Sequence, residues 1–345
     1  MKKFFLWLFG ACIMLWGGMA AAAPLNEPVC LVWQQQFKVK DVPLDKAIPA
    51  PVNVISPCWF DITNAGGDIQ QSPAASLTYV RRAHKEGRQV WALVTNSFEA
   101  EMTGKLLRSP LGRRHVIRQL EELCVQLELD GINLDFENIA DEDRALLTDF
   151  TADIARELHQ QGKVVSIDVT VPSHMPYWSQ CYDRKALAEA VDYLIVMAYD
   201  EYGPGSKSCG SVASLPWVEQ GIQNTLQEGV PKEKLVLGMP LYMRIWEETS
   251  DKKRATTLHM PAAEKLWREK GLQREWLEQE GQYYFEYQNE GKRYRVWQED
   301  ARSLALKSAL ISRYDLAGGA LWKSGVETDD VWEVLAKGIQ KAECF

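Results

Sequence analysis

Short apolar runs recur along the chain, and segments with the periodicity of a helix lie between them. Because each run is apolar at most positions, its residues are expected to be buried on both faces, as in a parallel sheet covered by helices. Eight such units predict a closed (β/α)8 barrel, the TIM barrel, with a doubly wound open sheet as the alternative. The runs are CLVWQ from residue 30, VNVIS from 52, QVWALVT from 89, GINLDF from 131, VVSIDVT from 164, YLIVMAY from 193, KLVLGMP from 234 and GGALWK from 318.

One interval between these runs is much longer than the others. The seventh and eighth runs begin 84 residues apart, whereas successive runs from the second to the seventh begin 29 to 42 residues apart. Inside the long interval, aromatic residues alternate with polar ones on both sides of Asn289-Glu290-Gly291, which predicts a β-hairpin. We therefore expect one domain over residues 24–345, with a small α+β insertion at about 245–300, between the seventh and eighth strands.

The fourth run has an unusual pattern of polar residues. Ile132, Leu134 and Phe136 alternate with Asn133, Asp135 and Glu137, and successive side chains of a strand point to opposite faces. The segment that follows has an apolar helical stripe that would cover the apolar face (Leu146, Leu147, Phe150, Ile154 and Leu158). The acidic face would then look into the barrel, with Glu137 at the C-terminal end, where barrel enzymes place their active sites. Buried carboxylates are costly unless they are hydrogen-bonded or protonated, so the pattern indicates chemistry rather than packing.

The N-terminal segment has the features of a secretory signal peptide. Lys2 and Lys3 precede an apolar run, and a Gly-Gly pair and small residues follow before Pro24. We expect residues 1–23 to be removed and the mature protein to be secreted or otherwise extracytoplasmic, in the cell wall or periplasm. An uncleaved membrane anchor is the alternative, because the apolar stretch is just long enough to span a bilayer of roughly 30 Å.

Charge and composition exclude several classes of partner. The formal net charge is −8 and basic residues form no cluster, so nucleic acid is not an expected partner. The five histidines are scattered and no zinc-binding spacing is present, so we expect no metal and no cofactor. A calcium site within residues 130–143 is not supported, because the loop lacks the required pattern of ligands.

The cysteines leave disulfide connectivity open. Six remain once Cys12 is removed with the signal segment, and six allow 15 pairings. We expect Cys181 to pair with Cys209, because both fall in loops after successive strands at the same end of the fold. Cys30 and Cys124 lie in apolar runs and are read as buried thiols.

Several motifs together resemble those of glycoside hydrolase family 18. The family signature Asp-x-x-Asp-x-Asp-x-Glu on the fourth barrel strand is matched at positions 130, 133, 135 and 137, with an Asn in the second place. The stretch GINLDFEN looks like the bacterial branch that includes spore cortex-lytic N-acetylglucosaminidases. The other matching stretches, in the expected order, are MAYDEYG from 197, GMPLYMRIW from 238, VWQEDARSLALK from 296 and GGALWK from 318.

This resemblance implies a mechanism in which the substrate's own acetamido group attacks the anomeric carbon. Glu137 would be the general acid and base, Asp135 would orient the acetamido group, and Tyr199 would hydrogen-bond its oxygen. Residues expected to bind substrate are Asn133, Asp200, Tyr242, Arg244 and Trp322, with Trp322 as the floor under the sugar ring. Met243 departs from the glycine usual in chitinases, which puts the local loop shape in doubt.

The resemblance implies a retaining glycosidase that cleaves β-linked N-acetylglucosamine glycans. Peptidoglycan is favoured over chitin because of the branch that the sequence resembles, and a carbohydrate-binding barrel without turnover is the alternative. Family members of that kind usually lose the acid, which is present here as Glu137. Because Asn133 replaces a carboxyl of the chitinase pattern, we expect Asp135 to ionise more readily than in a chitinase.

Overall fold

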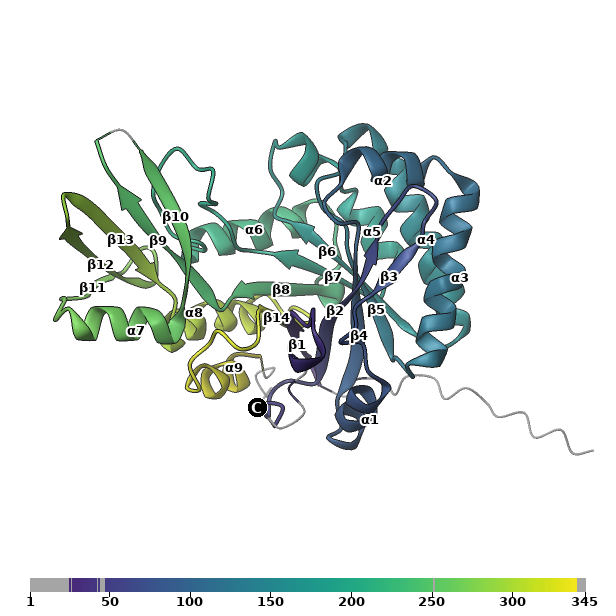
Figure 1. Cartoon of the computed structure of the whole chain (residues 1–345), viewed down its shortest axis with the longest axis horizontal. Helices are drawn as coiled ribbons and strands as arrows, with labels where there is room; N and C mark the ends of the chain where they lie inside the picture. The colour runs from purple at the N-terminus through teal and green to yellow at the C-terminus, as the bar shows by residue number, and fades with distance from the viewer. Residues whose placement is uncertain (1–24, 26, 42, 44–46, 251, 340–345) are drawn as a thin grey trace, which may run out of the picture.

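The chain folds into a closed barrel with a second sheet at one side (Figure 1). The structure is a computed structural model that describes residues 25, 27–41, 43, 47–250 and 252–339. In the barrel, β1 pairs in parallel with both β2 and β14, which closes the ring in the order β1-β2-β4-β5-β6-β7-β8-β14. The closed ring confirms the predicted (β/α)8 fold and rules out the open sheet.

Each of the eight predicted strands is present among the described residues. They are β1 Val29–Gln34, β2 Val54–Ile62, β4 Gln89–Thr95, β5 Gly131–Asp135, β6 Val164–Thr170, β7 Tyr193–Met197, β8 Leu235–Pro240 and β14 Gly318–Trp322. A short strand, β3 (Ile69–Gln71), pairs antiparallel with the end of β2. The helices around the barrel are α1 Leu77–Lys85, α2 Ala100–Leu107, α3 Pro110–Gln126, α4 Arg144–Gln160, α5 Arg184–Ala190, α6 Leu215–Gln227, α8 Ala301–Arg313 and α9 Val331–Ile339. Short single-turn helices lie at Val39–Asp41, Asp141–Asp143, Pro176–Gln180 and Lys232–Lys234.

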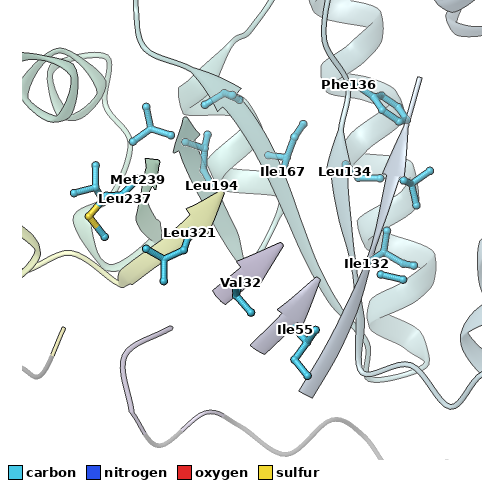
Figure 2. Close-up of a cluster of buried hydrophobic side chains, with 14 of the residues drawn as sticks. Val32, Ile55, Ile132, Leu134, Phe136, Ile167, Leu194, Leu237, Met239 and Leu321 are labelled. Carbon is cyan, nitrogen blue, oxygen red and sulfur yellow. The ribbon is translucent and has the colours of Figure 1, made fainter. Parts of the chain in front are cut away.

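The strands bury both of their faces, which explains their nearly continuous apolar sequences. The outward face packs against the helices and forms the larger apolar cluster, part of which is drawn in Figure 2. There Ile132, Leu134 and Phe136 of the β5 segment lie beside a helix, and Phe136 stacks on Phe150 of α4 with ring centroids 6.2 Å apart. The predicted cover over the apolar face of the fourth strand is therefore confirmed.

The inward face changes from apolar at the bottom of the barrel to polar near the top. A smaller cluster fills the bottom, where Trp91 stacks on Tyr193 with ring centroids 5.4 Å apart. Gly131 provides the room for this layer, because a Cβ there would lie 2.9 Å from the indole of Trp91. Above the apolar layer, Asn133 and Asp135 continue the inward row of β5, as the period-two pattern predicted.

A second, antiparallel sheet lies between β8 and β14 in the sequence. Its order is β10 (Lys253–His259), β9 (Tyr242–Glu248), β13 (Lys292–Gln298), β12 (Gln282–Asn289) and β11 (Glu275–Leu277), with α7 at Met260–Glu269. The sheet and α7 extend to one side of the barrel (Figure 1). The predicted hairpin is formed by β12 and β13, whereas the insertion begins at Tyr242, slightly before the expected residue 245.

A buried ion pair anchors the return from the second sheet to the barrel. Glu299 and Lys307 are fully buried, and the Lys307 Nζ lies 2.7 Å from both carboxylate oxygens of Glu299. Between them, Asp300 caps α8 by accepting a hydrogen bond from the Ser303 backbone amide. The motif over residues 296–307 therefore has a structural role, because it fixes the start of the helix that precedes β14.

The structure tests the expected disulfide but not the expected signal peptide. The expected disulfide between Cys181 and Cys209 is wrong for this structure, in which both are free thiols. The Cys181 Sγ is buried beside the Tyr177 carbonyl, whereas Cys209 interacts with Arg295 and Glu248 of the second sheet. The signal segment, residues 1–23, lies outside the described residues, and in the remainder no helix is long and apolar enough to cross a membrane.

Candidate active site

A cavity of about 1000 Å³ opens at the C-terminal ends of the barrel strands. Asp135 and Glu137 reach it from β5, Asp168 from β6 and Tyr199 from the segment after β7. Trp322, at the end of β14, lies on the other side of the ring. The cavity wall also contains Trp33, Phe98, Thr170, Val171, Pro172, Ser173, Met175, Trp178, Met197, Asp200, Glu201, Gly203, Gly205, Ser206, Trp217 and Tyr242.

Asp135 and Glu137 are neighbouring carboxyl groups that are hydrogen-bonded to each other. Burial raises the pKa of Asp135 to about 7. Burial, followed by the charges of Asp135, Asp168 and Asp200, raises the pKa of Glu137 well above its ordinary value. Their hydrogen bond raises the pKa of Glu137 and lowers that of Asp135, so the proton stays with Glu137. This pair can therefore present an acid and a carboxylate side by side.

The backbone of Glu137 is held by a side chain that sequence reasoning missed. Asn96 follows β4 and is fully buried, and its Oδ1 accepts a hydrogen bond from the Glu137 amide at 3.0 Å. Its Nδ2 donates to the Glu137 carbonyl at 2.8 Å. The Tyr182 hydroxyl donates to the carbonyl of Phe136, also at 2.8 Å. These bonds fix the chain just past the end of β5, where no strand ladder would position the acid.

Asn133 lies one layer below the cavity and is saturated with hydrogen bonds. Its Oδ1 accepts from Trp33 Nε1 at 2.8 Å and from Ser56 Oγ at 3.1 Å. Its Nδ2 donates to Ser166 Oγ at 3.1 Å and to Asp168 Oδ1 at 2.8 Å. The expected contact of Asn133 with substrate is therefore corrected, because the side chain does not line the cavity and all four bonds go to protein.

Asp168 is the second residue of the site that sequence reasoning missed. It is buried on β6 next to β5, and burial, followed by the charge of Asp135, raises its pKa well above the ordinary value. The signal was present, since Ser166, Asp168 and Thr170 alternate with apolar residues as the polar residues of β5 do. Asp168 gives Asp135 a buried acidic neighbour even though position 133 is an Asn, and the expectation that Asp135 ionises more readily than in a chitinase stays a prediction.

Aromatic side chains also line the cavity, and those of Trp33 and Tyr199 lie close to the buried acids. Trp322 packs against Trp33 with ring centroids 5.8 Å apart and an interplanar angle of 60°. Tyr199 meets Tyr242 edge to face at 6.4 Å. Gly238 on β8 provides room beside Tyr199, because a Cβ there would lie 3.5 Å from its ring and 2.8 Å from a carbonyl oxygen. The two aromatic pairs thus contribute apolar surface to the same cavity as the buried carboxyls.

The remaining predicted residues form an ion-pair cluster at the edge of the cavity. Asp200 Oδ1 accepts a hydrogen bond from the Tyr242 hydroxyl at 2.5 Å and pairs with Arg244 Nη2 at 2.6 Å. Arg244 is buried, and its guanidinium also lies 5.6 Å from the centre of the Tyr242 ring. The structure thus brings Asp200, Tyr242 and Arg244 together, and Asp200 and Tyr242 line the large cavity.

Metal chemistry has no visible support in the part of the chain that the structure describes. No group of three or more His, Cys, Asp or Glu side chains there could hold a metal ion. The acids of the cavity are instead held by hydrogen bonds and by one another. The cavity thus combines a pair of carboxyl groups able to exchange a proton with aromatic side chains in its wall.

Comparison with known proteins agrees with this geometry. The chain is 26% identical over 299 residues to the uncharacterized glycosylase YvbX of Bacillus subtilis (strain 168), covering 83% of this chain and 85% of that protein. It is 25% identical over 280 residues to the cortical fragment-lytic enzyme of the same organism, covering 78% of this chain and 64% of that protein. The crystal structure of a chitinase from Chromobacterium violaceum ATCC 12472 superposes with a TM-score of 0.80 at 24% identity, covering 91% of this chain and all of that one, which supports the fold.

The family model for glycosyl hydrolases family 18 matches residues 75–327. This range includes six of the eight barrel strands, the second sheet and all the carboxyl groups that line the cavity. The family assignment expected from the sequence motifs is confirmed, and with it a glycoside hydrolase activity. The chain belongs to glycosyl hydrolases family 18.

Proposed function

We propose that the protein is an exported, retaining glycosidase that hydrolyses β-linked N-acetylglucosamine glycans by substrate-assisted catalysis. Peptidoglycan is the favoured substrate and chitin oligomers are the second choice. The observation that carries the proposal is the hydrogen-bonded pair of Glu137 and Asp135, in one cavity with Tyr199 and Trp322. No metal ion or cofactor takes part in the steps that follow.

Glu137 supplies and recovers the proton. Its raised pKa favours the protonated form of the carboxyl, as a general acid requires. It donates the proton to the glycosidic oxygen as the bond to the anomeric carbon breaks, and the leaving sugar departs with a free hydroxyl. The resulting carboxylate then takes a proton from water as the water attacks the anomeric carbon, which regenerates the acid.

Asp135 positions the internal nucleophile. Its Oδ1 is buried and has no hydrogen-bond partner among the described residues, so it is available to accept the N–H of a 2-acetamido group. The acetamido oxygen would then attack the anomeric carbon and form a bicyclic ion whose charge Asp135 balances. The Tyr199 hydroxyl would donate to the acetamido oxygen. Water opens the ring on the original face, so the anomeric configuration is retained.

The sugar itself is held by Trp322 and Asp200. The Trp322 ring would stack on an apolar face of the sugar ring. Asp200 is anchored by Tyr242 and Arg244 and keeps about half of its side chain exposed, at 46%, to accept from sugar hydroxyls. This arrangement places the glycosidic oxygen on the side of Glu137.

Turnover by a Glu137→Gln variant tests the acid. We expect loss of roughly 10²- to 10⁴-fold in kcat on a β-N-acetylglucosaminide, with binding retained, because the amide cannot donate the proton. A Glu189→Gln variant, changed at an exposed carboxyl of α5, is the matched control and should keep parental activity. If the parent and Glu137→Gln bind the glycan equally and neither turns it over, the protein is a carbohydrate-binding barrel.

The acetamido role is tested with the substrate rather than the enzyme. The same glycan without its N-acetyl groups should not be hydrolysed, because the nucleophile is missing. Nuclear magnetic resonance of the first product formed should show the β-anomer. Equal rates for the two glycans, or an α-product, would contradict the mechanism.

The preference for peptidoglycan rests on the bacterial branch that the sequence resembles and on its relative named cortical fragment-lytic enzyme. Mass analysis of products from defined murein and chitin oligomers tests it. We expect faster cleavage of murein, at bonds that follow N-acetylglucosamine. Faster cleavage of chitin would make the second substrate the correct one.

Export rests on the N-terminal sequence alone. We expect the mature protein, purified from outside the cytoplasm, to begin after residue 23. N-terminal sequencing of that protein tests the cleavage. An intact N-terminus in the membrane fraction would support the uncleaved anchor instead.

A further inference from the structure

A second cavity, of about 300 Å³, adjoins the large one and shares part of its wall. Asp200, Tyr242 and Trp322 line both cavities. A molecule bound over Trp322 would therefore continue directly into the second cavity. Its remaining lining residues are Gln35, Arg244, Thr257, His259, Lys323 and Val326.

The second cavity contains the ammonium group of Lys323, which forms no ion pair with any carboxylate in the described part of the chain. The Lys323 Nζ donates a hydrogen bond to the amide oxygen of Gln35, a neutral group. No carboxylate of the described residues lies within 4.0 Å of it. Asp200 is the acid in the cavity lining, and Arg244 already pairs with it at 2.6 Å. The charge of Lys323 is therefore left without compensation inside the cavity.

An uncompensated lysine is unusual at this place in the protein. The chain carries a formal net charge of −8, and Lys323 is only partly exposed. The buried Lys307, in contrast, is neutralised by a carboxylate, because both oxygens of Glu299 lie 2.7 Å from its Nζ. Lys323 instead follows the sugar platform Trp322 directly in the sequence, and Gln35 holds its ammonium group without neutralising it.

We propose that the second cavity binds a sugar that carries a carboxylate, next to the sugar stacked on Trp322, and that Lys323 donates to that carboxylate. This inference rests on the proposed function and narrows its substrate class. Peptidoglycan alternates N-acetylglucosamine with a sugar that bears a lactyl ether, whose carboxylate is free or extended by a peptide. Chitin has no such group, so Lys323 would distinguish the two polymers.

The test compares three tetrasaccharides of equal length: a murein tetrasaccharide with free lactyl carboxylates, the same compound as its methyl ester, and the chitin tetramer. For the parent we expect a KM roughly five- to tenfold lower for the free acid than for the ester, the size of one partly exposed charge-assisted contact. Raising the salt concentration should reduce the difference in KM between the free acid and the ester. Because the ester comparison uses the unaltered protein, it does not depend on whether a variant folds.

Variants assign the effect to Lys323. In Lys323→Gln, the KM for the free acid should rise to that for the ester, while the KM for the chitin tetramer and all kcat values stay near parental. Lys323→Arg should keep part of the preference. Lys337→Gln, changed at a lysine of α9 that pairs with Glu333, is the matched control and should behave as the parent does.

The outcomes separate this inference from the proposed function. If the parent cleaves the tetrasaccharides with equal KM for acid and ester, the carboxylate subsite is wrong while the glycosidase stands. If Lys323→Gln keeps the full preference, another group makes the contact and the inference is wrong. If the parent cleaves none of the three, the proposed function and this inference both fail.

Discussion

Replacing Asp135 by Asn should stabilise the protein while it removes activity. Asp135 is buried, and its Oδ1 has no hydrogen-bond partner in the described part of the chain. Burial disfavours the charged form and raises the pKa of Asp135 to about 7, whereas the same carboxyl in the unfolded chain has a pKa of 3.8. Ionising this buried carboxyl therefore destabilises the folded protein, whereas an amide at this position would not ionise.

The sign and size of the effect follow from proton linkage. Between pH 3.8 and about 7 the unfolded chain has lost this proton and the folded protein still holds it, so stability falls as the pH rises. This loss of stability is complete above pH 7. About three pKa units, each worth about 1.4 kcal/mol, give a loss of at most about 4 kcal/mol. Removal of the Asp135 charge also eases ionisation of Glu137 and Asp168, which acts in the same direction.

Urea unfolding of the parent and of Asp135→Asn at several pH values measures this effect. The difference in unfolding free energy should shift in favour of the variant by about 3 kcal/mol between pH 4.5 and pH 8. Any effect of the amide at position 135 on packing that does not depend on pH is the same at both pH values, so it cancels when the two differences are compared. Asp149→Asn, changed at an exposed position of α4, is the control and should show no comparable shift. A difference for Asp135→Asn that does not change with pH would refute the reasoning.

Four further substitutions test three other contacts. Asn133→Asp would replace the amide that donates to Asp168 Oδ1 at 2.8 Å by a second carboxyl, and it should destabilise the fold by about 3 kcal/mol at pH 7. Adding Asp168→Asn should restore most of the lost stability, because the hydrogen-bond donor and acceptor then exchange places. Urea unfolding of both variants measures these effects. A double variant no more stable than the single variant would contradict the contact between residues 133 and 168. Lys307→Leu leaves the buried carboxylate of Glu299 unpaired and should cost about 3–5 kcal/mol in the same measurement, so a change below about 1 kcal/mol would count against the ion pair. Trp322→Ala removes the sugar platform and should lower kcat/KM roughly 10- to 100-fold, and steady-state kinetics giving an unchanged value would mean that the ring does not contact substrate.

The barrel was readable from the sequence because its strands are buried on both faces. Every parallel strand therefore had a short apolar run, and the interval lengths located the insertion. Within the insertion, the β12 and β13 hairpin was predicted from its aromatic alternation and turn. In contrast, β10 has polar residues on both faces and most of them are exposed, so no hydrophobic period marked it as a strand.

The site was predictable only where its residues followed a local pattern. The period of two in β5 identified Asp135 and Glu137, and the same period in β6 pointed to Asp168 but was not weighed. Asn96 had no such signal, because its partner Glu137 is 41 residues away and a single Asn after a strand is common in turns. The wrong pairing of Cys181 with Cys209 has the same origin, since lying at one end of a fold does not bring two side chains together.

Closure of the ring between β1 and β14 has a consequence for synthesis of the protein. The Trp33 and Trp322 rings, and the contact of Gln35 with Lys323 across 288 residues of sequence, join the first and last strands of the barrel. A ribosome must therefore finish almost the whole barrel before the sugar platform and its cationic neighbour exist. Until then β1 and β8 each present an unpaired edge, which is the form of the chain most exposed to aggregation and most in need of a chaperone.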